Sequence, residues 1–297
     1  MENTLSGRQV IEHLAEIYQQ LYLCPGEEGQ AQYGDIVKAG EDAEIKSLSH
    51  FTMNEKDTLA CLDTPAGSVL CVTLQERKDF ETFLRIMGHR CEAVEIPKTQ
   101  GASLLDGVIN WRKIYAREEE FFREEEEKGN PDPDWSSEFR RFTSDKKNYL
   151  DVIIVLSTGP YSAVSAERMG MPEEEWLTLS SVIRRYHECT HFICRKLYPE
   201  KKEPVWDELV ADAVGIYAAF RKFDPNIEKL FLGIEGDRYI GGRLENYVED
   251  GQEALAELTK KAARILGEFD IMIREKKEIE PFELVTLLED SMERLWG

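Results

Sequence analysis

The sequence predicts an α+β fold, with a mixed N-terminal part of helices and strands and a mainly α-helical C-terminal part that has a small sheet before its longest helix. Three observations lead to this prediction. Residues 68–74 have a β-type pattern and are followed directly by a helical pattern. Residues 150–156 are apolar and largely β-branched, which is typical of a strand. Beyond residue 172, apolar residues recur at the spacing of amphipathic helices.

The N-terminal part is expected to contain three helices and two strands. Its second strand is stopped by Pro97. Residues 25–49 are Gly- and acid-rich and weakly patterned. Residues 99–103 are small and polar, so we expect a connecting loop there, with a ligand-facing loop as the alternative. The expected elements are a helix at 5–23, a strand at 68–74, a helix at 76–87, a strand at 91–96 and a helix at 111–127.

A Pro- and Gly-rich break at residues 129–134 is the predicted domain boundary. It divides the chain into an N-terminal domain at residues 1–134 and a second domain at 135–297. The acidic run before the break is best interpreted as a solvated helix face. After the strand at 150–156, helices are expected at 172–197, 204–223, 252–274 and 281–295, with a short helical element near 225–232.

Composition and charge limit the classes of function. Lys and Arg number 37 against 58 Asp and Glu, a formal net charge of −21. Such a surface repels phosphate backbones and anionic lipid heads, so we expect neither nucleic acid nor a membrane as a partner. No apolar run approaches the roughly 20 residues that span a bilayer, and the first residues do not resemble a secretory signal. The six cysteines form no CxxC pair, so we expect a cytoplasmic protein with reduced thiols.

Residues 187–191 read His-Glu-Cys-Thr-His, an H-E-x-x-H motif inside the longest predicted helix. Two histidines four residues apart project from one helix face, so His187 and His191 can bind the same metal ion. Glu188 lies about 100° around the helix from His187. It is therefore placed to take a proton from a water acidified by zinc and to deliver it to a leaving group. The alternative is a pair of histidines satisfied inside a buried helix.

A catalytic zinc needs a third protein ligand and an open position. Glu208 stands seventeen residues after His191, on the predicted helix that begins at Pro204. Asp212 follows four residues later on the same face, where it is expected to accept the free ring N–H of a ligating histidine. Asp207 is the rival ligand, but it projects in another direction.

This pattern, H-E-x-x-H followed by Glu208 and Asp212 in E-x-x-x-D spacing, resembles the gluzincin branch of the zinc metallopeptidases, which includes thermolysin-like and ImmA/IrrE-type enzymes. The resemblance covers roughly residues 150–220. It implies that residues 135–297 form a zincin-like metallohydrolase domain. In that domain, one zinc ion would be held by His187, His191 and Glu208, with Glu188 as general base and acid and Asp212 as a partner behind the ligands. The N-terminal domain would be a lid, a specificity region or an inhibitory segment.

Two further expectations follow from the resemblance. Gluzincins bind an extended peptide along the edge of a strand that precedes the active-site helix, which would be residues 150–156; a core strand without this role is the alternative. They also use a Tyr or His beyond the third ligand to stabilise the oxyanion, and no histidine follows His191. The expected catalytic groups are therefore Tyr239 and Arg243, with Tyr247 on the same face if the segment is helical, Tyr161 and Tyr217 as alternatives, and packing as the simpler role for each.

Two other residue types lie near the motif. Arg184 is one turn before His187 and Glu188, so it either binds a substrate carboxylate or pairs with a carboxylate on the helix, Glu188 included. Cys189 and Cys194 are interpreted as small core residues rather than metal ligands.

These features predict a zinc-dependent hydrolase, and most specifically a metallopeptidase that acts on a peptide or protein. One alternative is a zinc hydrolase of a non-peptide substrate, or a regulatory protease with a single target. Another is a non-catalytic binding protein stabilised by zinc. Glu188 disfavours the last alternative, because a structural zinc site has no use for a carboxylate beside a water.

Overall fold

The structure is a computed structural model that describes residues 4–200, 203–248, 251–276 and 278–297. The chain forms two compact units. Unit 1 contains a mixed sheet with helices, and unit 2 is mainly helical, so the predicted α+β fold class is confirmed. Unit 1 comprises residues up to 61, 70–97 and 104–157, and unit 2 comprises residues 62–69, 98–103 and 158 onward.

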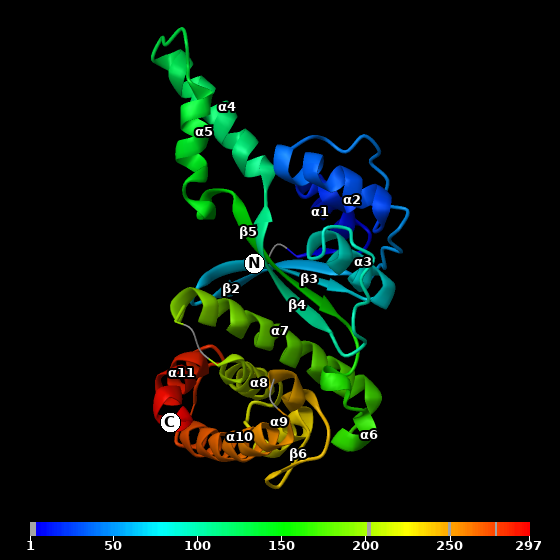
Figure 1. The fold of residues 1–297 in the computed structure, drawn as a ribbon, viewed down its shortest axis with the longest axis vertical. Coiled ribbons are helices and arrows are strands. Elements are labelled where there is room, and N and C mark those ends of the chain that lie inside the picture. Colours follow the sequence, from blue (N-terminus) through cyan, green and yellow to red (C-terminus); the bar gives the residue numbers. More distant parts are fainter. Residues whose placement is uncertain (1–3, 201–202, 249–250, 277) are drawn as a thin grey trace. The chain divides into compact units, whose positions relative to one another are not determined.

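A five-stranded sheet in the order β1-β2-β3-β5-β4 forms the centre of unit 1 (Figure 1). β1 pairs antiparallel with β2, whereas β3 and β5 run parallel, with Leu70 opposite Ile153. β5 therefore has a strand on each side, and β4 is the outer strand beside it. The strands are β1 (Leu5–Ser6), β2 (Thr58–Thr64), β3 (Gly67–Leu74), β4 (Ala102–Ile109) and β5 (Leu150–Ser157).

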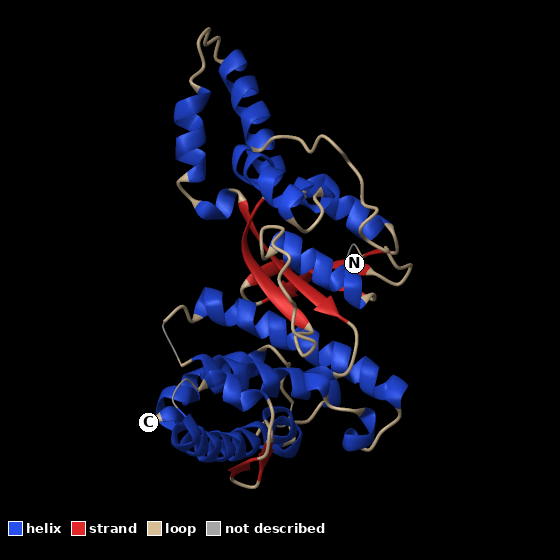
Figure 2. Cartoon of the chain, turned by 45° about the vertical axis from the view of Figure 1, so that its right-hand side comes forward, coloured by secondary structure: helices blue, strands red, loops and turns tan. Residues whose placement is uncertain are grey.

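The core of unit 1 lies between one face of this sheet and two helices, α1 (Gln9–Ile17) and α3 (Arg77–Met87) (Figure 2). Side chains alternate across a strand, so every second residue of β3 and β5, such as Val72 and Val155, joins the same apolar cluster as these helices. The rest of the N-terminal segment is made of short elements: the 3-10 helix η1 (Gln19–Tyr22), α2 (Glu27–Tyr33) and the π-helical segment η2 (Gly34–Ala39).

The strand predicted at residues 91–96 is wrong, because this segment forms no strand. Cys91 has a left-handed φ of 64° and its carbonyl accepts a hydrogen bond from the Gly26 N–H at 2.7 Å. The carbonyl of Val94 accepts from Arg85 at 2.8 Å. Loop and side-chain donors thus take the place of a neighbouring strand. The strand in this region is β4, part of which was expected to be a loop because of its small residues.

The helix predicted over residues 5–23 is interrupted. Gly7 has a left-handed φ of 74°, which separates β1 from α1, and α1 ends at Ile17 before η1 begins. Two predicted helices of unit 1, α3 and α4 (Trp111–Glu127), agree with the prediction within a residue, whereas α2 and the helix at Trp135–Thr143 were not predicted.

The acidic helix α4 and α5 (Trp135–Thr143) form a helical hairpin within unit 1, and residues 129–134 lie in the loop that joins them (Figure 1). The predicted boundary at this loop therefore does not coincide with the division between the units, which falls at residues 157 and 158. A break rich in Pro and Gly is compatible both with a loop inside one unit and with a boundary between two domains.

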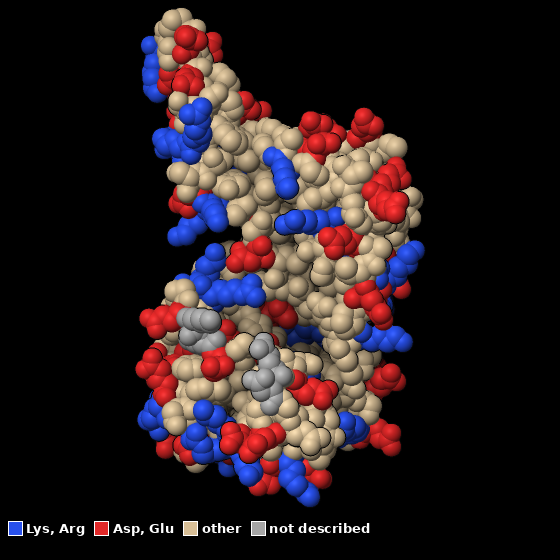
Figure 3. All heavy atoms as spheres, viewed as in Figure 1, with Lys and Arg blue, Asp and Glu red and all other residues tan. Residues whose placement is uncertain are grey.

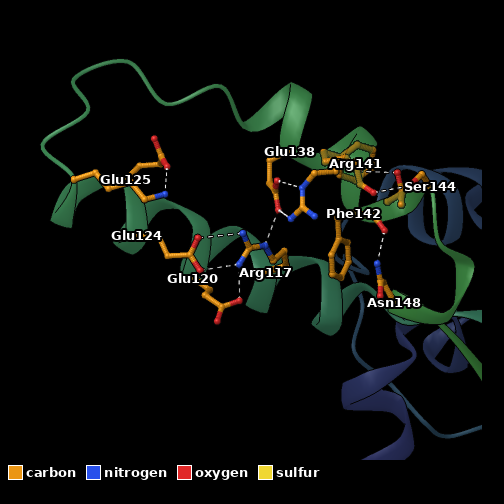
Figure 4. Close-up of polar contacts among 12 residues, drawn as sticks. Arg117, Glu120, Glu124, Glu125, Glu138, Arg141, Phe142, Ser144 and Asn148 are labelled. Atoms are coloured by element: carbon orange, nitrogen blue, oxygen red, sulfur yellow. Dashed lines mark hydrogen bonds and ion pairs between the residues drawn. The ribbon is translucent and has the colours of Figure 1, made fainter.

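Arg117 of α4 forms ion pairs within its own helix and across the hairpin to α5 (Figure 4). The Arg117 side chain, 15% exposed, lies 2.7 Å from Glu138, 2.6 Å from Glu120 and 3.1 Å from Glu124. Hydrogen bonds from Arg141 and from Arg117 lower the pKa of Glu138 to about 2, against the opposing effect of burial. One arginine from α4 thus joins the two helices through a carboxylate of α5.

Unit 2 is built on the packing of α7 against α8. Gly215 of α8 lies so close to α7 that a Cβ there would come within 2.7 Å of the Ile183 carbonyl oxygen. The indole N–H of Trp176 donates a hydrogen bond to the Val164 carbonyl at 2.7 Å inside the apolar core. The helices are α6 (Ala166–Met169), α7 (Glu173–Leu197), α8 (Pro204–Phe220), α9 (Pro225–Leu232), α10 (Gly251–Arg274) and α11 (Glu283–Trp296).

The segment in which Tyr239, Arg243 and Tyr247 would share a face if it were helical is not an α-helix. β6 (Ile234–Glu235) and β7 (Arg238–Tyr239) pair as a short hairpin, and the 3-10 helix η5 (Arg243–Tyr247) follows. Gly233 and Gly242 approach so closely that neither position has room for a side chain.

Among the described residues, no helix is both long enough and apolar enough to cross a bilayer. Acidic and basic side chains are interspersed on the face drawn in Figure 3, so that face carries no extended region of a single charge sign.

Candidate metal centre

Helices α7 and α8 bring together His187, His191 and Glu208 in unit 2. The Nε2 atoms of the two histidines are 3.0 Å apart. Glu208 places one carboxylate oxygen 3.4 Å from His191 Nε2 and the other 3.6 Å from His187 Nε2. The three residues can therefore offer one ligand atom each to a single metal ion.

The separations in this group suit zinc. Bonds of about 2.0–2.1 Å in a tetrahedral arrangement place ligand atoms about 3.3 Å from one another. The observed separations of 3.0, 3.4 and 3.6 Å bracket that value. Two imidazoles and one carboxylate are also a donor set that zinc accepts, with a fourth position left for water or substrate.

The electrostatics of the group are dominated by Glu208. Burial opposes a charge on His191, but the hydrogen bond and the charge of Glu208 raise the pKa of His191 to about 9. Burial also opposes the carboxylate, yet His191 and His187 hold the pKa of Glu208 well below its ordinary value. A metal ligand must be a neutral imidazole, so binding of a metal ion would displace a proton from His191.

A hydrogen-bond network fixes the orientation of His187. Its Nδ1 atom lies 2.8 Å from a carboxylate oxygen of Asp212 and 2.9 Å from the Tyr161 hydroxyl, which itself donates to Asp212 at 2.6 Å. Because the Asp212 carboxylate can only accept a hydrogen bond, we infer that Nδ1 carries the ring proton. The Nε2 atom is then unprotonated and has a lone pair to offer to a metal ion. Asp212 itself is fully buried, so its carboxylate is shielded from solvent where it holds this tautomer.

Arg243 lies behind the ligands. It donates to the second oxygen of Asp212, and its Nη1 is 3.4 Å from the Tyr161 hydroxyl and 3.9 Å from Glu208. The charge of Arg243 is thus shared by two carboxylates of the site. Arg243 was expected to be a catalytic group, and in the structure its guanidinium is engaged by Asp212, Tyr161 and Glu208.

Tyr239 is not part of this group. Its hydroxyl donates to the Gly242 carbonyl and accepts from the Gly242 N–H, both at 2.8 Å, which occupies it with the loop between β7 and η5. Tyr247 is closer to this group in its electrostatics: burial first, and then the charge of Glu208, raise the pKa of Tyr247. Tyr217, the other alternative, lies on α8 with Arg221 over its ring.

Tyr161 is held in place from two sides. The Ser180 hydroxyl accepts from its backbone N–H at 3.0 Å, and Arg184 lies over its ring at 5.8 Å. Arg184 also donates to the carbonyls of Gly159 and Pro160 at 3.2 and 3.4 Å, so it binds the backbone of the turn that carries Tyr161.

Glu188 lies on α7 between the ligand face and the core and is 8% exposed. Its charge contributes to the raised pKa of His191, which places it near the ligands without making it one of them. The role of proton acceptor that the motif predicts for Glu188 stays a prediction.

Glu228 is the member of this region that sequence reasoning missed. It is fully buried on α9, and neither carboxylate oxygen has a hydrogen-bond partner in the described part of the chain. Burial, followed by the charges of Asp212 and Glu208, raises its pKa, against the opposing charge of Arg243. Burial and the neighbouring carboxylates therefore favour the neutral form of Glu228. Its spacing from the buried Phe231 and Leu232 indicates the inward face of α9 and is the signal that could have identified it.

A second group, Cys194, Asp207 and Glu289, also brings possible metal ligands together. The Cys194 thiol donates to Glu289 at 3.2 Å, and the Trp206 N–H donates to the other Glu289 oxygen at 3.1 Å. Asp207, the rival to Glu208 in the sequence, thus belongs to a different group. This second group lacks the imidazole pair and the adjacent carboxylate that distinguish the first.

Fold and site together define an α+β protein with a helix-borne group of three possible metal ligands. The chain belongs to a family described as "Family of unknown function (DUF7005)", whose model matches residues 4–296 and so spans both units. No curated protein and no solved structure matches the chain.

Proposed function

We propose that this protein is a zinc-dependent hydrolase, and most specifically a metallopeptidase that carries one zinc ion per chain. The observation that supports the proposal is the convergence of His187, His191 and Glu208 at separations that suit tetrahedral zinc, with Glu188 beside them. A non-catalytic zinc site has no need for that neighbouring carboxylate.

Each residue has a separate task in the proposed reaction. A zinc ion in this site would supply Lewis acidity, which lowers the pKa of a water and polarises a scissile carbonyl. Glu188 takes the proton of the attacking water and returns it to the leaving amine. Asp212 and Tyr161 keep His187 in the tautomer whose Nε2 is free. Glu208 completes the donor set.

Tyr247 is the proposed donor to the oxyanion. The charge of Glu208 contributes to the raised pKa of Tyr247, after burial, which supports a place for its hydroxyl near the ligand group, whereas the hydroxyl of Tyr239 is occupied by Gly242. Arg243 supports the site from behind, because its guanidinium already binds Asp212.

A cleavage assay against a peptide library tests the proposal. The purified protein is expected to cleave a subset of peptides, to lose that activity when zinc is removed with 1,10-phenanthroline, and to regain it when zinc is added back. Cleavage that persists in the metal-free protein would contradict zinc-dependent hydrolysis. Zinc binding without cleavage of any peptide would instead indicate a non-peptide substrate or a single protein target.

A further inference from the structure

Unit 1 contains a thiol–imidazole pair that is separate from the metal centre. The Cys24 sulfur lies 3.6 Å from Nδ1 of His50, which is within hydrogen-bonding distance for sulfur. Cys24 is exposed and His50 is half-buried, so the thiol can be reached from solvent while its partner is held by the protein. The two residues are 26 positions apart and are brought together by the fold.

The other ring nitrogen sets the tautomer of His50. Nε2 lies 3.0 Å from the Leu21 carbonyl oxygen, which can only accept a hydrogen bond. The proton is therefore on Nε2, and Nδ1 is left as an acceptor for the Cys24 thiol. Burial lowers the pKa of His50, against the hydrogen bond to Leu21, and so favours the neutral ring, in which Nδ1 is an acceptor.

This arrangement has the three parts of an activated nucleophile: a thiol, a base within hydrogen-bonding reach, and a third group that orients the base. The His50 ring also packs against buried Phe51, with ring centroids 4.7 Å apart, which limits its rotation. The Leu21 carbonyl and Phe51 together hold Nδ1 toward the sulfur.

We propose that Cys24 and His50 form a reactive thiol site at which Cys24 is modified by low-molecular-weight disulfides. The Cys24 sulfur attacks one sulfur of the reagent, a new S–S bond forms, and the S–S bond of the reagent breaks. His50 Nδ1 accepts the thiol proton and passes it to the departing thiolate. The products are a mixed disulfide on Cys24 and one free thiol, and no other oxidant is needed.

The remaining cysteines differ from Cys24. Cys71, Cys91, Cys189 and Cys194 are buried, and burial raises the pKa of Cys91 to about 12. Cys61 is exposed like Cys24, but no hydrogen-bond partner is found for its thiol within the described residues. Cys61 is therefore an internal control for a solvent-exposed thiol without a base.

The test compares two variants of the full chain, Cys61→Ser and Cys24→Ser, in reaction with the uncharged disulfide 4,4′-dithiodipyridine at about pH 7. A free thiol is only a few per cent ionised at that pH, so complete transfer of its proton would raise the thiolate fraction about thirtyfold. Part of this gain is lost because a less basic thiolate is a weaker nucleophile. We expect Cys24 to react about ten times faster than Cys61, with mass spectrometry locating the mixed disulfide.

His50→Gln in the Cys61→Ser background separates the base from simple exposure. Glutamine can still donate to the Leu21 carbonyl, but it provides no basic nitrogen at the position of Nδ1. We expect the Cys24 rate to fall to that of Cys61 while the thermal unfolding temperature stays within a few degrees. Equal rates for Cys24 and Cys61 in the otherwise native chain would overturn the proposal, as would an undiminished rate in a folded His50→Gln variant. Neither result depends on the metal centre, which lies in unit 2.

Discussion

Replacing Glu188 with glutamine is expected to lower the rate of peptide hydrolysis at least about a hundredfold while leaving the zinc content unchanged. Glutamine has nearly the same shape as glutamate, so the packing around this 8%-exposed side chain is retained. The amide cannot take a proton from the attacking water. Glu188 is not among the three grouped ligands, so the metal site keeps its donors.

The rate is measured with a peptide identified in the library assay, and zinc is measured on the same samples by mass spectrometry. Glu175→Gln is a matched control, because Glu175 is an exposed residue in the first turn of the same helix, three turns from His187. Hydrolysis that is undiminished in Glu188→Gln would refute the base role. Loss of zinc in that variant would mean that Glu188 is a ligand.

Replacing Glu208 with glutamine is expected to lower zinc affinity by at least about a hundredfold. Partners that only orient metal ligands are worth about 10–100-fold in affinity, and a direct ligand is worth at least as much. The substitution removes both a charged donor atom and the carboxylate that lies 3.4 Å from His191 and 3.6 Å from His187. Affinity is measured by competition with a chromophoric chelator.

Asp207→Asn is the matched control for Glu208→Gln, because it makes the same change of charge at the neighbouring residue. Asp207 belongs to the group with Cys194 and Glu289, so its replacement is expected to leave zinc affinity at the first group within a fewfold of the native value. The reverse result, loss of zinc in Asp207→Asn alone, would place the metal in the second group.

The grouping of possible metal ligands could be predicted because much of its geometry is local. His187 and His191 share a helix face whenever the segment is helical, and Glu208 and Asp212 share another for the same reason. The packing of α7 against α8 then brings the two faces together. This last step was inferred from the distance along the chain, and the close approach at Gly215 is its structural cause.

The groups around the ligands could not be predicted in the same way, because they come from turns and short elements. Tyr239, Arg243 and Tyr247 were assigned to one helix face, but a hairpin and a 3-10 helix place them differently. Tyr161 reaches His187 because Ser180 and Arg184 hold its turn. These contacts depend on tertiary structure, which residue spacing does not encode.

Prediction from the sequence had the same limit for the sheet. The strands at β3 and β5 were recognised from their β-branched residues, but the order of strands was not. Residues 150–156 were expected to offer a free edge to a peptide, and this expectation is wrong because β5 lies between β3 and β4. β4 was missed because Gly101, Gly107 and small polar residues are typical of loops.

The most direct test of the metal centre is a crystal structure of the zinc-loaded protein with anomalous data collected at the zinc absorption edge. We expect one strong anomalous peak per chain, about 2.0–2.2 Å from Nε2 of His187, Nε2 of His191 and a carboxylate oxygen of Glu208. A peak among Cys194, Asp207 and Glu289 instead, or no peak at the histidine pair, would contradict the account.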